Sequence, residues 1–170
     1  MLKALATKFP EVKIIEPDVF ADERGYFKET FSAQKYRALD IDDHFVQDNI
    51  SYSLKGVLRG MHYDPRMAKL VQAIHGSVYD VVVDMRPQSR TYKRWAGVEL
   101  SAQNHRQLYI PAGFAHGFLT LSDEAIVAYK QTALYDPRSE RGVSWRDPEI
   151  GIVWPLDGRA PILSAKDAAL

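Results

Sequence analysis

The 170-residue sequence contains no cysteine, which excludes disulfide bonds, thiolate metal sites and a thiol nucleophile. Acidic and basic residues balance at 22 each, so any anion-binding site must be local, and we expect neither a nucleic-acid nor a membrane partner. No apolar run approaches the roughly 20 residues that a membrane span needs, and the N-terminal stretch, interrupted by lysines, does not have the pattern of a signal peptide. We therefore expect a cytoplasmic protein.

Internal repeats, low-complexity tracts and linkers are absent as well, so residues 1–170 are predicted to form a single domain. Short apolar or alternating segments recur between glycines and prolines, a pattern that is typical of an all-β sandwich or barrel. We expect strands at residues 12–16, 26–31, 45–51, 69–75, 77–84, 95–100, 106–110, 114–121 and 125–131.

Three local signals refine this prediction. Gly76 separates two apolar runs, which indicates a hairpin or a sharply bent strand. Ser32 is expected to cap a short helix that continues through Leu39, and Ser164 is expected to cap a final helical turn. Residues 22–25, Asp-Glu-Arg-Gly, are predicted to form a turn.

The functional side chains are concentrated in residues 57–63, Val-Leu-Arg-Gly-Met-His-Tyr, and at Lys69 just downstream. A guanidinium, an imidazole and an ammonium group thus lie close together where a buried strand is predicted. Cations beside a base indicate an anionic ligand and proton-transfer chemistry. From residue types alone, a structural role for His62 and a barrel-filling role for Tyr129 remain open.

Pro111, Gly113 and His116 have the spacing P-x-G-x-x-H, which resembles the second sequence motif of cupins, small jelly-roll barrels. The first cupin motif normally supplies two histidines and a glutamate, whereas His62 stands alone here. His62 and His116 are fewer than the roughly three protein ligands of a catalytic zinc or iron site. We therefore expect no metal.

Several further segments follow one another in a recognisable order between about residue 12 and residue 167. They are residues 22–29, 47–49, 56–63, 68–71, 110–118, 129–130, 145–148 and 161–167. Together they resemble the dTDP-4-dehydrorhamnose 3,5-epimerase family, the metal-free cupins of nucleotide-deoxysugar synthesis. The resemblance implies a cupin-type double-stranded β-helix with a few short helices, and an epimerase that needs no cofactor.

The resemblance also implies a catalytic set. His62 would be the base that removes a proton next to the sugar ketone, and Asp167 would hold its imidazole. Tyr129 would supply a proton on the opposite face of the sugar. Lys69 would face the keto oxygen, where negative charge develops.

The remaining residues that the resemblance assigns would bind a nucleotide-diphosphate sugar. Arg24 and Arg59 would bind the diphosphate through their forked donors. Phe27 and Tyr135 would supply aromatic surface for the base. The other assigned positions are Glu29, Gln47, Asp48, Asn49, His116, Glu140 and Lys166.

We therefore expect inversion at C3, C5 or both carbons of a nucleotide-linked 4-keto-6-deoxy sugar, with dTDP-4-keto-6-deoxyglucose converted to dTDP-4-keto-rhamnose. Residues 64–67 replace a longer loop of the family pattern, and this shorter version resembles relatives that act on GDP-linked 4-keto-6-deoxyheptoses. A non-catalytic cupin that binds sugar nucleotides and a metal-dependent cupin oxygenase are further alternatives. We also expect a homodimer in which residues 12–15 add to the sheet edge of a partner.

Overall fold

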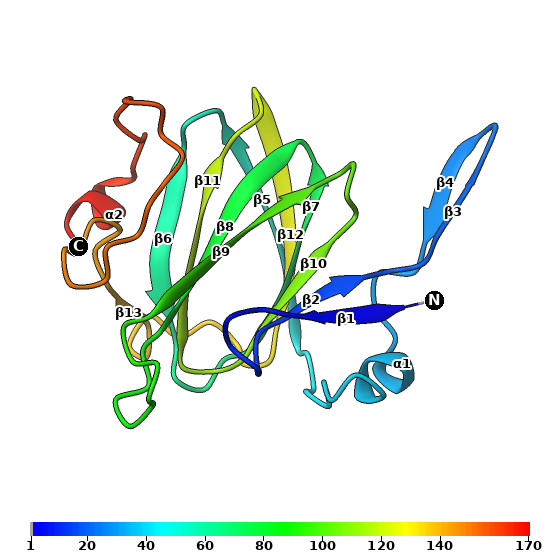
Figure 1. Cartoon of the computed structure of the whole chain (residues 1–170), viewed down its shortest axis with the longest axis horizontal. Coiled ribbons are helices and arrows are strands. Elements are labelled where there is room, and N and C mark those ends of the chain that lie inside the picture. The colour runs from blue at the N-terminus through cyan, green and yellow to red at the C-terminus, as the bar shows by residue number, and fades with distance from the viewer. Residues whose placement is uncertain (1) are drawn as a thin grey trace.

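The computed structural model describes residues 2–170, and antiparallel strands are its main secondary structure (Figure 1). The strands are β1 (Lys3–Ala6), β2 (Lys13–Glu16), β3 (Val19–Asp22), β4 (Gly25–Lys28), β5 (Gln47–Leu54), β6 (Leu58–Tyr63), β7 (Lys69–His75), β8 (Ser77–Asp84), β9 (Trp95–Ser101), β10 (Gln107–Ile110), β11 (Phe114–Thr120), β12 (Glu124–Gln131) and β13 (Arg141–Gly142). The helices are α1 (Ala33–Arg37) and α2 (Ala165–Ala168). Neither of them is long and apolar enough to cross a membrane. The all-β prediction is confirmed.

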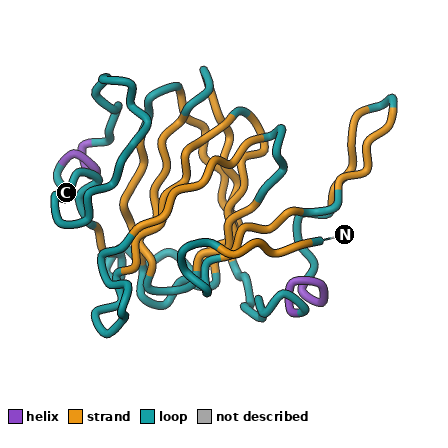
Figure 2. Tube along the Cα trace, in the orientation of Figure 1, coloured by secondary structure: helices purple, strands orange, loops and turns teal. Residues whose placement is uncertain are grey.

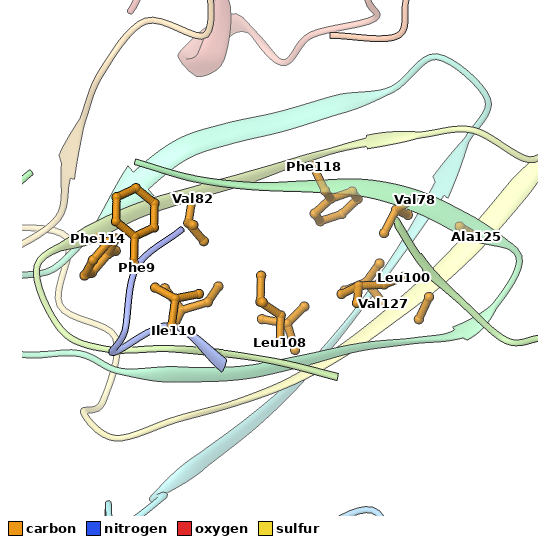
Figure 3. Packing of buried hydrophobic residues seen from close by; sticks show 13 residues of the cluster. Phe9, Val78, Val82, Leu100, Leu108, Ile110, Phe114, Phe118, Ala125 and Val127 are labelled. Atoms are coloured by element: carbon orange, nitrogen blue, oxygen red, sulfur yellow. The ribbon is translucent and has the colours of Figure 1, made fainter. Parts of the chain in front are cut away.

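Most strands belong to two sheets that pack face to face, as the trace in Figure 2 shows. One sheet has the order β1-β2-β10-β7-β12-β5, and the other has the order β13-β6-β11-β8-β9. Apolar side chains from both sheets fill the space between them, among them Val82, Leu108 and Phe118, and Phe9 joins them from the turn between β1 and β2 (Figure 3). This core follows from the alternation in the sequence, because every second residue of a strand points to the same face.

Gly76 is the corner where the chain passes from one sheet to the other. β7 pairs with β10 and β12, whereas β8 pairs with β11 and β9. The bent-strand interpretation is therefore correct, and the hairpin interpretation is wrong, because the two runs never pair with each other. Gly76 has a φ of 68°, and a Cβ atom there would lie 2.1 Å from the Glu124 carbonyl oxygen. No other residue fits this corner without strain.

The N-terminal strand differs from the expectation. β2 is paired on both sides, by β1 and by β10, so residues 12–15 do not present a free edge to a partner. The reason is the turn between β1 and β2, which the Thr7 hydroxyl stabilises by donating to the Phe9 and Val12 carbonyls, so that β1 lies antiparallel to β2. The edge of this sheet is β1, whose side chains are all exposed.

The two helices begin where the sequence predicts. α1 ends at Arg37, short of the predicted Leu39, and the Ser32 side chain makes no capping hydrogen bond. Burial of Tyr36 holds α1 in place instead. In α2, the Ser164 hydroxyl accepts a hydrogen bond from the backbone N–H of Asp167 at 3.1 Å, as a helix cap should.

The hairpin formed by β3 and β4, residues 19–28, is called the arm here. Its turn at residues 22–25 is the one that the sequence predicts. The arm extends away from the two sheets, on the side of the molecule opposite α2 (Figure 1). Phe20 and Phe27 on the arm are 63% and 70% exposed. Large apolar side chains with so little cover indicate a surface that contacts another molecule.

Candidate active site

A cavity of about 310 Å³ opens beside β6, and residues from β7, β11, β12 and α2 complete its wall. The predicted catalytic residues His62, Lys69, Tyr129 and Asp167 all line it. So do the predicted ligand-binding residues Arg59, His116, Glu140 and Lys166. A larger cavity of about 590 Å³ contains none of the predicted site residues. The fold therefore gathers most of the predicted site in one place.

His62 has the geometry of a supported base. Its Nε2 lies 2.5 Å from Asp167 Oδ1, and Asp167 is buried. Its Nδ1 is also buried but has no hydrogen-bond partner. An ionised carboxylate only accepts hydrogen bonds, so Nε2 carries the hydrogen and Nδ1 carries the free lone pair. The nitrogen that can take a proton is therefore the one that Asp167 leaves unoccupied.

A second carboxylate lies near the free nitrogen of His62. Glu140 Oε1 is 3.9 Å from His62 Nδ1, too far for a hydrogen bond but within the range of an ion pair. The Lys166 ammonium donates to Glu140 Oε2, and the Tyr135 hydroxyl donates to the same oxygen at 3.3 Å. Glu140 is thus fixed by two donors at the rim of the cavity.

Tyr129 and Lys69 have pKa values that move in opposite directions. Burial raises the pKa of the Tyr129 phenol, the Glu140 charge adds to this rise, and the nearby Arg59 opposes it. Burial lowers the pKa of the Lys69 ammonium, although the carboxylates of Asp80 and Glu140 oppose that shift. Tyr129 therefore keeps its proton at neutral pH and can act as an acid.

Two glycines form the floor of the cavity, where β6 and β11 lie against each other. A Cβ atom at Gly60 would lie 2.6 Å from the Gly117 Cα, and one at Gly117 would lie 2.7 Å from the Arg59 carbonyl oxygen. Both obstacles are backbone atoms that have no room to move. This close approach makes His62 and His116 cross-strand neighbours, with a register shift immediately beyond them.

The model of the dTDP-4-dehydrorhamnose 3,5-epimerase family matches residues 6–170, which is nearly the whole chain. The chain belongs to this family. A dTDP-4-dehydrorhamnose 3,5-epimerase of Salmonella typhimurium is 50% identical over 173 residues, which cover 99% of this chain and 94% of that protein. The predicted family resemblance is confirmed.

Solved structures agree with this assignment. The dTDP-6-deoxy-D-glucose-3,5-epimerase of Legionella pneumophila, in complex with dTDP-4-keto-L-rhamnose, has a TM-score of 0.96 and 50% identity over 99% of this chain and 91% of that one. The dTDP-4-dehydrorhamnose 3,5-epimerase of Bacillus anthracis, with TDP and PPi bound, has a TM-score of 0.96 and 45% identity over 100% of this chain and 98% of that one. The cupin jelly roll predicted from the sequence is the fold of this chain.

Asp80 is a residue beside the site that was not predicted from the sequence. It is fully buried, and its Oδ2 lies 2.9 Å from His116 Nε2. Its Oδ1 has no hydrogen-bond partner, and its charge acts on Lys69. The sequence contains a sign of its role, because an aspartate within the apolar run of residues 78–83 would be buried and therefore needs a partner.

Three predicted binding residues lie on the arm or at its base, away from the cavity. Arg24 and Phe27 are exposed on the arm, and Glu29 is exposed at its base. Arg24 pairs with Asp22 of the same turn at 2.6 Å. Because the arm and α2 lie on opposite sides of the molecule, Arg24 and Phe27 do not reach the cavity of their own chain (Figure 1).

A second cavity of about 110 Å³ shares His62, Lys69, Tyr129 and Glu140 with the first. Tyr135 lines it, and its backbone N–H donates to Gln47 Oε1 at 3.2 Å. Gln47 in turn donates to Asn49, and Asn49 donates to Gln131 on the cavity wall.

Asp48 is the exception on this strand. It is exposed and paired with Lys130 at 2.9 Å, and together with Asn49 it borders a separate groove. As for a metal, residues 2–170 contain no group of three or more His, Asp or Glu side chains that could hold one.

Proposed function

We propose that this protein inverts C3 and C5 of dTDP-4-keto-6-deoxyglucose by proton transfer through an enolate, without a cofactor. The observation that carries the proposal is the unpartnered Nδ1 of His62, which shares a cavity with Tyr129 and Lys69. A binding protein needs no such nitrogen, since burying an unpaired polar atom only costs stability. The activity of the relatives supports the same conclusion.

In the proposed reaction, His62 Nδ1 takes the proton from the carbon next to the ketone. The electron pair of that C–H bond forms the C=C bond of the enolate, and the π pair of the ketone moves onto its oxygen. The imidazolium that forms is stabilised by Asp167 on one side and Glu140 on the other. Lys69 stabilises the enolate oxygen. Tyr129 then donates its phenolic proton to the opposite face. The imidazolium of His62 releases its proton to solvent and the tyrosinate takes one up from solvent, which restores both residues to their starting state.

Turnover in D2O tests this proposal against the binding cupin and against the GDP-heptose epimerase. Proton NMR detects the uptake of deuterium. With dTDP-4-keto-6-deoxyglucose we expect deuterium at both C3 and C5, whereas the GDP-linked 4-keto-6-deoxyheptose should remain unlabelled. Deuterium at only one carbon would show that the protein is an epimerase of a single carbon. A folded protein that binds dTDP and exchanges neither proton would leave only the binding role.

We further propose that the protein works as a homodimer in which each arm completes the cavity of the other chain. The arm carries Arg24 and Phe27 away from their own cavity, and its aromatic side chains are uncovered. A second uncovered apolar surface, called the outer stripe here, consists of Ile50, Tyr52 and Leu54, which are 69%, 52% and 55% exposed along β5. If two copies pair across these surfaces, one cavity contains His62 and Arg59 of its own chain and Arg24 from the arm of the other chain. Such a cavity holds the base and both of the arginines proposed to bind the diphosphate.

Ile50→Asp is expected to produce monomers, because a carboxylate in the centre of an apolar interface would be buried without a partner. Sedimentation of the wild type should give twice the mass of one chain, and the variant should give one. Val153→Asp is the matched control, since Val153 is 70% exposed on the C-terminal segment. A monomeric wild type with full activity would disprove the dimer. A cytoplasmic location stays a prediction.

A further inference from the structure

Gln107 is a fully buried polar side chain outside the cavity, at 0% exposure. It lies on β10, and both ends of its amide are engaged. Its Nε2 donates to the Thr30 carbonyl at 2.7 Å, and its Oε1 accepts from the Tyr36 hydroxyl. A buried amide without partners would cost stability, whereas one with fixed partners on distant segments acts as a rigid joint between them.

The joint holds the base of the arm. Thr30 follows the last residue of β4, Lys28, by two positions, and its carbonyl lies 3.1 Å from the Tyr36 hydroxyl, whose single hydrogen it shares with Gln107 Oε1. Three elements, β10, α1 and the arm, therefore meet at one carbonyl oxygen. Since Tyr36 is itself 1% exposed, the meeting point is shielded from water, which would otherwise compete for these hydrogen bonds.

Beyond this joint the arm has little support. The side chains of Tyr26 and Phe27 are exposed. The Tyr26 ring makes an edge contact with His105 at 4.6 Å between centroids, and His105 lies two residues before Gln107. Because the hairpin is fixed only at its base, a small rotation of the base moves the turn, where Arg24 lies, by a larger distance.

We propose that Gln107 is a positioning residue for the epimerase reaction: it fixes the direction of the arm, so that Arg24, Phe27 and Glu29 meet the nucleotide diphosphate in the cavity of the partner. This inference rests on the proposed function and on the exchange of arms. Gln107 lies outside the cavity, so it acts through the arm on substrate affinity and leaves the proton transfers unchanged. Its loss should raise KM and spare kcat.

The variant Gln107→Met keeps the length of the side chain and removes both hydrogen bonds. We expect the KM for dTDP-4-keto-6-deoxyglucose to rise about tenfold, as for one lost hydrogen bond to a charged ligand, with kcat within about twofold of the wild type. Tyr36→Phe leaves the bond from Gln107 to Thr30 in place and should raise KM less. This milder variant also serves if Gln107→Met does not fold, and an unchanged KM in it would then reject the proposal.

Mixed dimers separate positioning in trans from a general loss of structure. Gln107→Met and His62→Ala chains, carrying different affinity tags, are co-expressed, and the heterodimer is isolated by two successive purifications. Its one working cavity combines the intact His62 of the first chain with the intact arm of the second chain. We expect this heterodimer to have the KM of the wild type and about half of its kcat, because one site in two is active.

The outcomes are distinct. An unchanged KM in the Gln107→Met homodimer, or a raised KM that persists in the heterodimer, would overturn the proposal, since Gln107 would then act on no site or on its own. The proposed function is judged separately, by turnover of the wild type and its loss in the His62→Ala homodimer. A wild type without turnover would overturn both the epimerase assignment and the role of Gln107 in that reaction.

Discussion

Replacement of His62 by alanine is expected to lower kcat by about 10³- to 10⁴-fold, because it removes the group that takes the proton and leaves no substitute in the cavity. Steady-state turnover, measured as product formation and as deuterium uptake, reports the loss. Affinity for dTDP should change little, since Nδ1 is placed for the sugar carbon rather than for the nucleotide. The effect is therefore a fall in kcat with a nearly constant Kd for dTDP.

The partner of His62 supplies the control. Asp167→Ala should lower kcat by less, because the imidazole survives but loses the acceptor that fixes its tautomer. The double variant should be no worse than His62→Ala alone, since Asp167 acts only through His62. Losses that multiply in the double variant, or a His62→Ala enzyme with a tenth of wild-type turnover, would show that another residue is the base.

Lys69 is expected to give the second largest effect. Lys69→Met should lower kcat/KM by about 10²- to 10³-fold, the usual loss when a donor to a developing oxyanion is removed. The pH dependence tests the charge itself. Burial lowers the pKa of Lys69, so in the free wild-type enzyme the ammonium is lost, and kcat/KM falls, at a lower pH than for a lysine in water.

Lys69→Arg provides the comparison, because a guanidinium keeps its charge throughout this pH range. The variant should be slower at neutral pH, owing to its larger head group, but its alkaline decline should move upward. The decline that remains would belong to Tyr129, whose raised pKa delays the loss of its proton. An alkaline decline at the same pH in both enzymes would show that Lys69 is not the group that titrates.

The sequence predicts nine of the thirteen strands in residues 2–170 because both sheets have a buried face, and burial imposes alternation or continuous apolar runs, whereas β1, β3, β6 and β13 are not among the predicted strands. The corner at Gly76 is only half predictable: glycine indicates a change of direction, but it does not tell which strand each run joins. The sequence did not predict that β2 is paired on both sides. This pairing depends on the turn at Thr7, which places β1 beside β2. Pairing depends on partners that lie far apart in sequence.

The sequence likewise predicts some features of the site and not others. His62 and Asp167 could be paired in advance only through resemblance to a family, because they are 105 residues apart. The residue types indicate proton transfer to an anionic substrate, but they do not indicate that Arg24 lies on an arm pointing away from its own cavity. Asp80 could have been found by asking which partner an aspartate in an apolar strand requires.

The paired glycines at the floor of the cavity determine which parts of this enzyme can be redesigned. Gly60 and Gly117 face backbone atoms, so neither accepts a larger residue, and their rigidity keeps the neighbouring histidines in register. New sugar preferences therefore have to come from the rim, where residues 64–67 border the smaller cavity. A mutant library for altered sugars should keep β6 and β11 constant and vary this short loop and the arm.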